Sequence, residues 1–191
     1  MRPAVPADAP ALAALYVRAW RAAYPGLVPQ DYLDALVPGD RLGLFQATLA
    51  AVAWPRRGVL VLDATGPGAP GTPLGFVSLG PSRDEDADPA LVGEIETLYL
   101  DPAAFGTGAG DLLMAGALRC LEEGGYRSAT LWVLGTNTRA RRFYARHGWH
   151  PDGALVRHDW GAFVATDVRY ARALGPAVTK GPGPGAARGA R

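Results

Sequence analysis

The chain has 191 residues, which is long enough for one domain with its own hydrophobic core and short for two. Hydrophobic residues make up 49% of it, and Lys+Arg 19 against Asp+Glu 18 leaves a net charge of +1, which excludes the strongly basic class of nucleic-acid-binding proteins. The single cysteine, Cys120, excludes an internal disulfide and a cysteine-rich zinc site, and its helical apolar surroundings predict a buried structural thiol.

The first eighty residues predict a short strand, two helical regions and a β-hairpin. In chain order the expected elements are a strand at 2–5, helices at 8–24 and about 29–53, and strands at 58–64 and 74–80. Asp8 stands where it would cap the first helix, and Pro38-Gly39 is expected to interrupt the second region. The Gly- and Pro-rich residues 65–73 predict an exposed connection within the hairpin.

The second half of the chain alternates strands and helices before two closing strands. In chain order these are strands at 91–100 and 128–134, helices at 108–124 and 137–148, and an antiparallel pair at 150–158 and 162–172. The acidic stretch 81–90 predicts a solvated loop, and 175–191 predicts a flexible tail after a single domain of residues 1–174. This order indicates an α/β protein with a mixed sheet and helices on both faces.

A glycine-rich loop stands between the predicted strand at 91–100 and the helix that follows. Glycine recurs at 106, 108 and 110, a density typical of backbone that approaches a phosphate closely. A P-loop is excluded because Asp111 follows Gly110, and a dinucleotide-binding loop is excluded by the G-x-G-x-G spacing. Two interpretations remain: an anion held by the N–H groups and dipole of the helix start, or a turn without a ligand.

A second motif runs from Asn137 to Tyr144 on the predicted helix at 137–148. The two residues are seven positions apart, so at about 3.6 residues per turn their side chains share one face, about 10 Å apart along the axis. An extended ligand fits along that face, between a polar anchor and a phenol. The alternatives are a helix N-cap for Asn137 and a half-buried ring for Tyr144.

Taken together, the two motifs resemble the GNAT superfamily of acyl-CoA-dependent N-acetyltransferases, and the resemblance extends over residues 1 to about 172. Phe105-Gly106-Thr107-Gly108-Ala109-Gly110 is similar to that family's Q/R-x-x-G-x-G/A signature, with Phe105 in the Gln/Arg position as in a bacterial subgroup. The segment N-x-R-A-R-R-F-Y-x-R-x-G-W is close to the family's second CoA-binding motif. The resemblance implies a central twisted, mostly antiparallel sheet with one splayed parallel strand pair and helices on both faces.

The resemblance also implies acetyl-CoA as co-substrate, without a metal, and direct acetyl transfer to a primary amine of a small molecule or protein. The pantetheine arm would lie where strands 94–100 and 128–134 splay apart. The cofactor-binding residues that this implies are Leu98, Tyr99, Leu100, Phe105, Gly106, Thr107, Gly108, Ala109, Gly110, Asp111, Asn137, Ala140 and Phe143.

Two titratable side chains are the catalytic candidates. Glu96 shares a strand face with Glu94 and lies closer to the splay, so we expect it to be a general base, with an ion pair or a substrate-cation anchor as the alternative. Tyr144 is the expected proton donor to the departing thiolate. Trp20 and Tyr24 are expected to line the acceptor site together with Glu96, although core packing also suits Trp20.

The expected partners are the amine acceptor and a second copy of the chain, since dimers are common among the proteins that this chain resembles. The spacing of His147, His150 and His158 suits no metal site. No run reaches the ~18 apolar residues of a membrane span and no signal peptide is evident, so we expect a cytoplasmic protein that contacts neither membranes nor nucleic acids. The alternative function is a CoA-binding sensor or accessory protein that keeps the fold without catalysis.

Overall fold

The computed structural model describes residues 1–64, 71–159, 161 and 163–175. Seven strands form one sheet in the order β1-β2-β3-β4-β5-β7-β6. The strands are β1 (Arg2–Pro3), β2 (Gly58–Asp63), β3 (Pro73–Pro81), β4 (Val92–Leu100), β5 (Ser128–Leu134), β6 (His150–Asp159) and β7 (Val164–Ala173). The helices are α1 (Ala9–Ala23), α2 (Gln30–Ala35), α3 (Gly39–Ala50), α4 (Ala109–Glu123) and α5 (Thr138–Arg146), with 3-10 turns η1 (Pro6–Asp8) and η2 (Pro102–Ala104).

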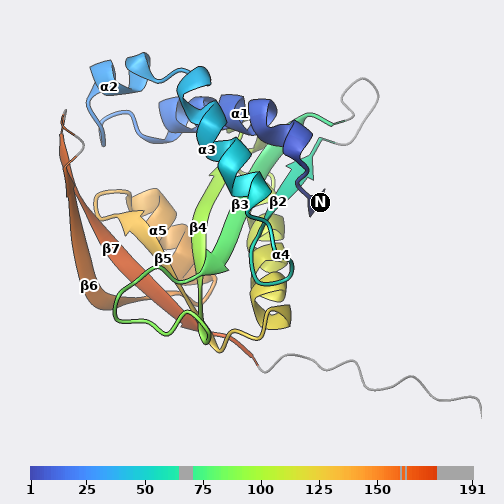
Figure 1. Cartoon of the computed structure of the whole chain (residues 1–191). Helices are drawn as coiled ribbons and strands as arrows, with labels where there is room; N and C mark the ends of the chain where they lie inside the picture. Colours follow the sequence, from blue (N-terminus) through green and yellow to red (C-terminus); the bar gives the residue numbers. More distant parts are fainter. Residues whose placement is uncertain (65–70, 160, 162, 176–191) are drawn as a thin grey trace, which may run out of the picture.

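Helices cover the sheet on both sides, and each side has its own core (Figure 1). Val59 and Val61 of β2 pack with α1 and α3, whereas Leu60 between them packs with α4. This alternation follows from the two-residue period of a strand, which sends neighbouring side chains to opposite faces. We call the side of α1, α2 and α3 the upper face and the side of α4 and α5 the lower face.

The chain order of elements that the sequence predicts is confirmed. Pro38-Gly39 separates α2 from α3, β2 and β3 pair antiparallel, and β6 and β7 close the sheet as an antiparallel pair. Residues 65–70 of the predicted connection and all but Gly175 of the predicted tail lie outside the described residues. No helix in the described part of the chain is long and apolar enough to cross a membrane.

Two local predictions are corrected. The Asp8 side chain does not cap α1, because it accepts hydrogen bonds from the Arg2 guanidinium and the Val5 N–H instead. Cys120 is half-buried where the sequence predicts full burial, and desolvation still raises the pKa of its thiol. A thiol held in its protonated form is a poor nucleophile, so its structural interpretation stands.

The strands β4 and β5 are parallel and diverge. Their register runs from Val92 beside Ser128 to Glu94 beside Thr130, and it stops there although both strands continue. The predicted splay between the two strands is therefore present. Every other described strand pair in the sheet is antiparallel.

Candidate functional site

The edge of β4 beyond Glu94 turns backbone groups toward the gap. The Asp101 N–H donates to the Leu74 carbonyl on the β3 side, at 2.8 Å. Successive residues of a strand point their backbone groups alternately to the two sides, so Leu100 and Leu98 point theirs toward β5. These are the residues that the sequence assigns to a pantetheine arm, and the geometry leaves their polar groups available to an extended ligand.

A β-bulge interrupts β4 at Glu96. Ser78 pairs with Thr97 and Leu79 pairs with Ile95, so Glu96 is the extra residue between them. The sequence gives no sign of this bulge, which bends a strand and redirects its side chains. Glu96 Oε1 lies on the face of Gly80, the residue paired with Glu94, so both glutamates share the upper face as predicted.

Both glutamates have arginine partners. Glu94 is buried and accepts three hydrogen bonds from Arg83, one from the main chain and two from the guanidinium. Glu96 accepts one from Arg57 Nη1 at 3.0 Å. A carboxylate accepts about four hydrogen bonds, so the Arg57 contact leaves Glu96 able to bind a further donor.

The glycine-rich loop turns directly into α4. Gly106 and Gly108 have φ angles of 77° and 86°, in the left-handed region that favours glycine, and a Cβ at either position would meet nothing within 4 Å. The first internal bond of the helix runs from the Leu112 N–H to the Gly108 carbonyl. The main-chain N–H groups before it lie at the positive end of the helix dipole, and the space beside Gly106 and Gly108 is open.

A guanidinium stands beside this loop although the loop itself has no basic residue. Arg139 of α5 stacks on the Phe105 ring, with its Cζ atom 4.1 Å from the ring centroid. Phe105 therefore replaces the Gln/Arg of the family signature with an aromatic platform that holds a cation next to the loop. Arg139 is an exposed residue of α5 that also contacts this ring.

Gly110 and Asp111 join α4 to α5. A Cβ on Gly110 would come within 3.1 Å of the Phe143 ring, so glycine permits the close packing of the two helices. Asp111 accepts hydrogen bonds from Arg146 and His147, and these contacts lower the pKa of its carboxyl. A role for Asp111 toward a ligand rests on its main-chain N–H, because the side chain is engaged with α5.

Asn137 caps α5. Its Oδ1 accepts the Ala140 N–H at 3.0 Å, and the residue is buried, so the N-cap alternative is confirmed. Tyr144 lies on the same helix, half-buried against the lower core, with its ring centroid 5.4 Å from that of Phe143. Whether Asn137, Ala140 and Phe143 also contact a cofactor remains a prediction.

Three phenols from different parts of the chain, Tyr24, Tyr99 and Tyr144, affect one another's ionisation. Burial raises the pKa of Tyr144, and the neighbouring Tyr24 phenol raises it further. Burial likewise raises the pKa of Tyr99, with additional effects from Tyr24 and Tyr144. Trp20 stacks on Tyr24 with a centroid separation of 4.4 Å and is itself buried, so the core-packing alternative for Trp20 is confirmed. The predicted acceptor-site residue Tyr24 is thus within electrostatic range of the predicted proton donor Tyr144.

These phenols predict an alkaline limit to stability. Burial raises the pKa of Tyr16, Tyr24, Tyr99 and Tyr144 in the folded protein, whereas tyrosines of the unfolded chain ionise near pH ~10. Above that pH the folded state binds more protons than the unfolded state, so the free energy of unfolding falls as pH rises. Phenolate absorbance should show fewer ionised tyrosines at about pH 11 in native than in guanidinium-unfolded protein. Coincident titration curves would contradict this.

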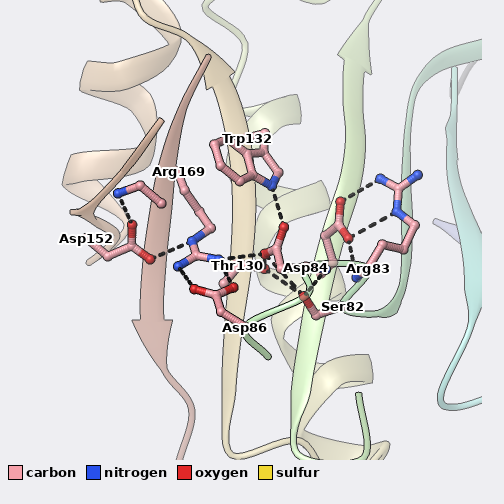
Figure 2. Close-up of polar contacts among 10 residues, drawn as sticks. Ser82, Arg83, Asp84, Asp86, Thr130, Trp132, Asp152 and Arg169 are labelled. Atoms are coloured by element: carbon pink, nitrogen blue, oxygen red, sulfur yellow. Dashed lines mark hydrogen bonds and ion pairs between the residues drawn. The ribbon is translucent and has the colours of Figure 1, made fainter. Parts of the chain in front are cut away.

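The loop between β3 and β4 is tied across the upper face of the sheet (Figure 2). Arg169 of β7 forms a bidentate pair with Asp86, a hydrogen bond to Asp152, and an ion pair of 3.2 Å with Asp84. Asp84 also accepts the Trp132 indole N–H at 2.9 Å. The prediction of a solvated acidic loop is therefore wrong for Asp84, whose side chain is only 11% exposed. Trp132 is half-buried in this network and not in the core.

Acetyl-CoA fits the residues present. The gap supplies backbone groups for an extended arm, and the loop at Gly106 and Gly108 supplies a cradle that side chains would fill. Arg139 adds a cation beside that cradle. Among the described residues no group of three or more His, Cys, Asp or Glu side chains could hold a metal ion.

A methyl group added at Gly108 tests whether the glycine-rich loop binds the pyrophosphate of acetyl-CoA. Gly108→Ala combines left-handed strain of about 1 kcal/mol with a Cβ in the space assigned to pyrophosphate, so we expect acetyl-CoA affinity to fall about tenfold or more. Gly153→Ala is the matched control, because Gly153 has a φ of 97° and equally open surroundings on the distant strand β6. Calorimetric titration should show the affinity loss for Gly108→Ala alone, although both variants lose stability. Equal affinities would remove the loop from the binding site.

Comparison with known proteins relates these features to a family. Residues 15–149 match the model of the acetyltransferase (GNAT) family. An uncharacterised N-acetyltransferase of Mycobacterium bovis is 31% identical over 147 residues, covering 76% of this chain and 85% of that relative. One from Archaeoglobus fulgidus is 41% identical over 75 residues, covering 39% of this chain, and the match spans about half (51%) of that relative's length.

The fold also matches a solved structure. A putative acetyltransferase from Salmonella typhimurium, determined with its cofactor acetyl-CoA, has a TM-score of 0.65 at 20% identity, over 91% of this chain and 92% of that one. At this identity the likeness shows a shared fold. That fold is the mixed sheet with helices on both faces that the sequence predicts.

Proposed function

The chain belongs to the acetyltransferase (GNAT) family, and from that membership we propose that it moves the acetyl group of acetyl-CoA directly to a primary amine. The observation that carries the proposal is the gap between β4 and β5, with the Leu98 and Leu100 backbone along it and the glycine cradle nearby. Bound acetyl-CoA supplies an acyl group activated as a thioester. All other chemistry falls to side chains and main-chain groups of this protein.

Positioning is the first contribution of the protein. The N–H groups at the start of α4 bind the pyrophosphate, with Arg139 beside them, and the β4 edge continues as a partner for the pantetheine amides. A main-chain N–H of β4 polarises the thioester carbonyl, a stabilisation that needs no titratable group. An extended arm held in this way directs the thioester toward Tyr144 and the upper face.

Proton transfer is the second contribution. Glu96 accepts a proton from the acceptor ammonium, which frees a lone pair on nitrogen. A C–N bond then forms and the C–S bond breaks. Tyr144 donates its proton to the departing thiolate and regains one from the acylated nitrogen, so the sum is an amide, a thiol and one released proton. Burial raises the pKa of Tyr144, which keeps the phenol protonated and makes a separate phenolate costly, so donation to sulfur is coupled to the proton that Tyr144 regains from nitrogen.

Release of free thiol from acetyl-CoA, measured with a panel of amines, tests the function. The expected result is amine-dependent thiol release with an acetylated product identified by mass spectrometry. Binding of acetyl-CoA without turnover on any amine would favour the non-catalytic sensor. We further propose that the acceptor is a small molecule or a protein amino group and that the chain forms a homodimer, which sedimentation of the purified protein would test.

A further inference from the structure

A carboxylate outside the predicted site lies on the upper face of β7. Asp167 pairs with Leu134 of β5 and with Val156 of β6. Because strand side chains alternate, Asp167 shares its face with Arg169 and opposes Val168, which packs in the lower core. It therefore faces the same side as α1 and the loop between β3 and β4.

The charge of Asp167 is not neutralised by the arginine two residues away. Arg169 is fully engaged by three carboxylates, those of Asp84, Asp86 and Asp152. The ionic partner of Asp167 among the described residues is His158, whose Nε2 lies 3.6 Å away, beyond hydrogen-bond range. The Asp167 side chain is 22% exposed, and burial raises the pKa of its carboxyl while His158 opposes that rise. A half-buried carboxylate of this kind is stabilised by a cation that donates hydrogen bonds to it.

Aromatic rings gather on the same face of the sheet as this carboxylate. Tyr24 is close enough for the charge of Asp167 to raise the pKa of its phenol, and the same Tyr24 adjoins Tyr144. Tyr24 is thus within electrostatic range of both Asp167 and Tyr144. Tyr32 and Phe163 extend the aromatic surface, with their ring centroids 5.1 Å apart. Ring faces attract ammonium groups, so carboxylate and rings favour the same ligand charge.

A cavity of about 300 Å³ opens next to Asp167. Leu134, the register partner of Asp167, and Ala165, which shares its face, line the cavity together with Leu27 and Val164. Its size is at the low end of ligand pockets, which suits a group about as large as a phenyl ring. Gly135, Thr136 and Thr166 complete the lining, so the wall combines aliphatic side chains with two hydroxyls and holds no charged residue.

We propose that Asp167 binds the ammonium group of the acceptor, and that the acceptor is a small primary amine with one apolar alkyl or arylalkyl tail. The inference rests on the proposed acetyl transfer and specifies its second substrate. The ammonium binds Asp167, the tail occupies the cavity beside Leu134, and the proton that the nitrogen loses before attack reaches Glu96 through water. An amine with a second charge would meet no charged partner among the residues that line the cavity, so a tail without charge is favoured.

Phenethylamine and 2-phenylethanol are the matched probes, because they share a tail and differ in the charged group. We would measure the binding of each to the CoA-loaded protein by calorimetry, for the natural chain, Asp167→Asn and Asp40→Asn. Asp40 is an exposed residue of α3 and provides the same change of charge away from the site. Thermal melting of each variant checks that it is folded.

The expected result is that Asp167→Asn weakens phenethylamine binding about tenfold or more and changes 2-phenylethanol binding by less than about twofold. Asp40→Asn should match the natural chain for both probes. Unchanged phenethylamine binding in Asp167→Asn, equal weakening of both probes, or no binding to the natural chain would overturn the inference. Turnover is read separately: amine binding that depends on Asp167, without acetylation of any amine, would refute the proposed function and not the ammonium site.

Discussion

Replacing Tyr144 with phenylalanine is expected to lower kcat about 100-fold while the dissociation constant of acetyl-CoA changes less than about twofold. The phenylalanine ring keeps the contacts of Tyr144 with Phe143 and the lower core, so packing and cofactor affinity are retained. What is lost is the one proton that the proposed mechanism delivers to the thiolate. Steady-state thiol release and calorimetric titration with acetyl-CoA measure the two quantities.

Tyr170→Phe is the matched control for this substitution. The Tyr170 ring centroid lies 6.4 Å from that of Tyr144, and its hydroxyl accepts a hydrogen bond from Arg141. We expect its kcat to stay within about threefold of the natural chain, with a stability loss near 1 kcal/mol for the missing hydrogen bond. An unchanged kcat in Tyr144→Phe, or an equal fall in both variants, would remove Tyr144 from the mechanism.

Arg169→Met is expected to destabilise the protein by about 3 kcal/mol, because it leaves the Asp84 carboxylate buried without its cation. The methionine keeps the length of the side chain and much of its apolar stem. The pairing with Asp86 contributes little to this figure, since that carboxylate is exposed to solvent and salt. Chemical denaturation monitored by circular dichroism gives the free energy of unfolding.

The exposed arginine Arg157 on the adjacent strand β6 provides the control, and Arg157→Met should change stability by less than about 0.5 kcal/mol. A double variant separates charge from packing. If Arg169→Met destabilises the protein because the Asp84 carboxylate loses its cation, adding Asp84→Asn should restore a measurable part of the lost free energy of unfolding. A double variant as unstable as the sum of its single changes would show that the two residues act independently.

Local patterns in the sequence predict most of the fold. The helix from Ala9 to Ala23 and the strands flanking the glycine loop follow from periodicity, and periodicity depends only on neighbouring residues. The break at Pro38-Gly39 follows from proline and glycine chemistry in the same way. The glycine-rich loop with Gly106 and Gly108 also follows from the sequence, because a strand–loop–helix unit is encoded within a few residues.

What the sequence misses depends on partners far along the chain. Arg169 meets Asp86 across 83 positions, and nothing near either residue indicates the other, so the acidic loop was predicted to be solvated. The bulge at Glu96 arises from the register in which β4 pairs with β3. The alternation of residues within β4 predicts a strand but not the register of its pairing with another strand. In the sequence, Asp167 is an ordinary polar residue on a predicted strand. Its surroundings become known only when the positions of β5 and α1 are known. The one signal available was a carboxylate at alternate spacing with Arg169.

The parting of β4 from β5 divides the sheet into two leaves joined along a short seam. One leaf is β1 to β4 and the other is β5, β7 and β6, and the backbone seam is three residue pairs long, ending at Glu94 and Thr130. Arg169 and Trp132 fasten the leaves again through Asp84, on the same side of the sheet (Figure 2). A donor molecule lying in the gap would touch both leaves at once. A donor in the gap would therefore connect the two leaves through its contacts with both. The angle between the leaves would then help to set the shape of the site that binds the acceptor.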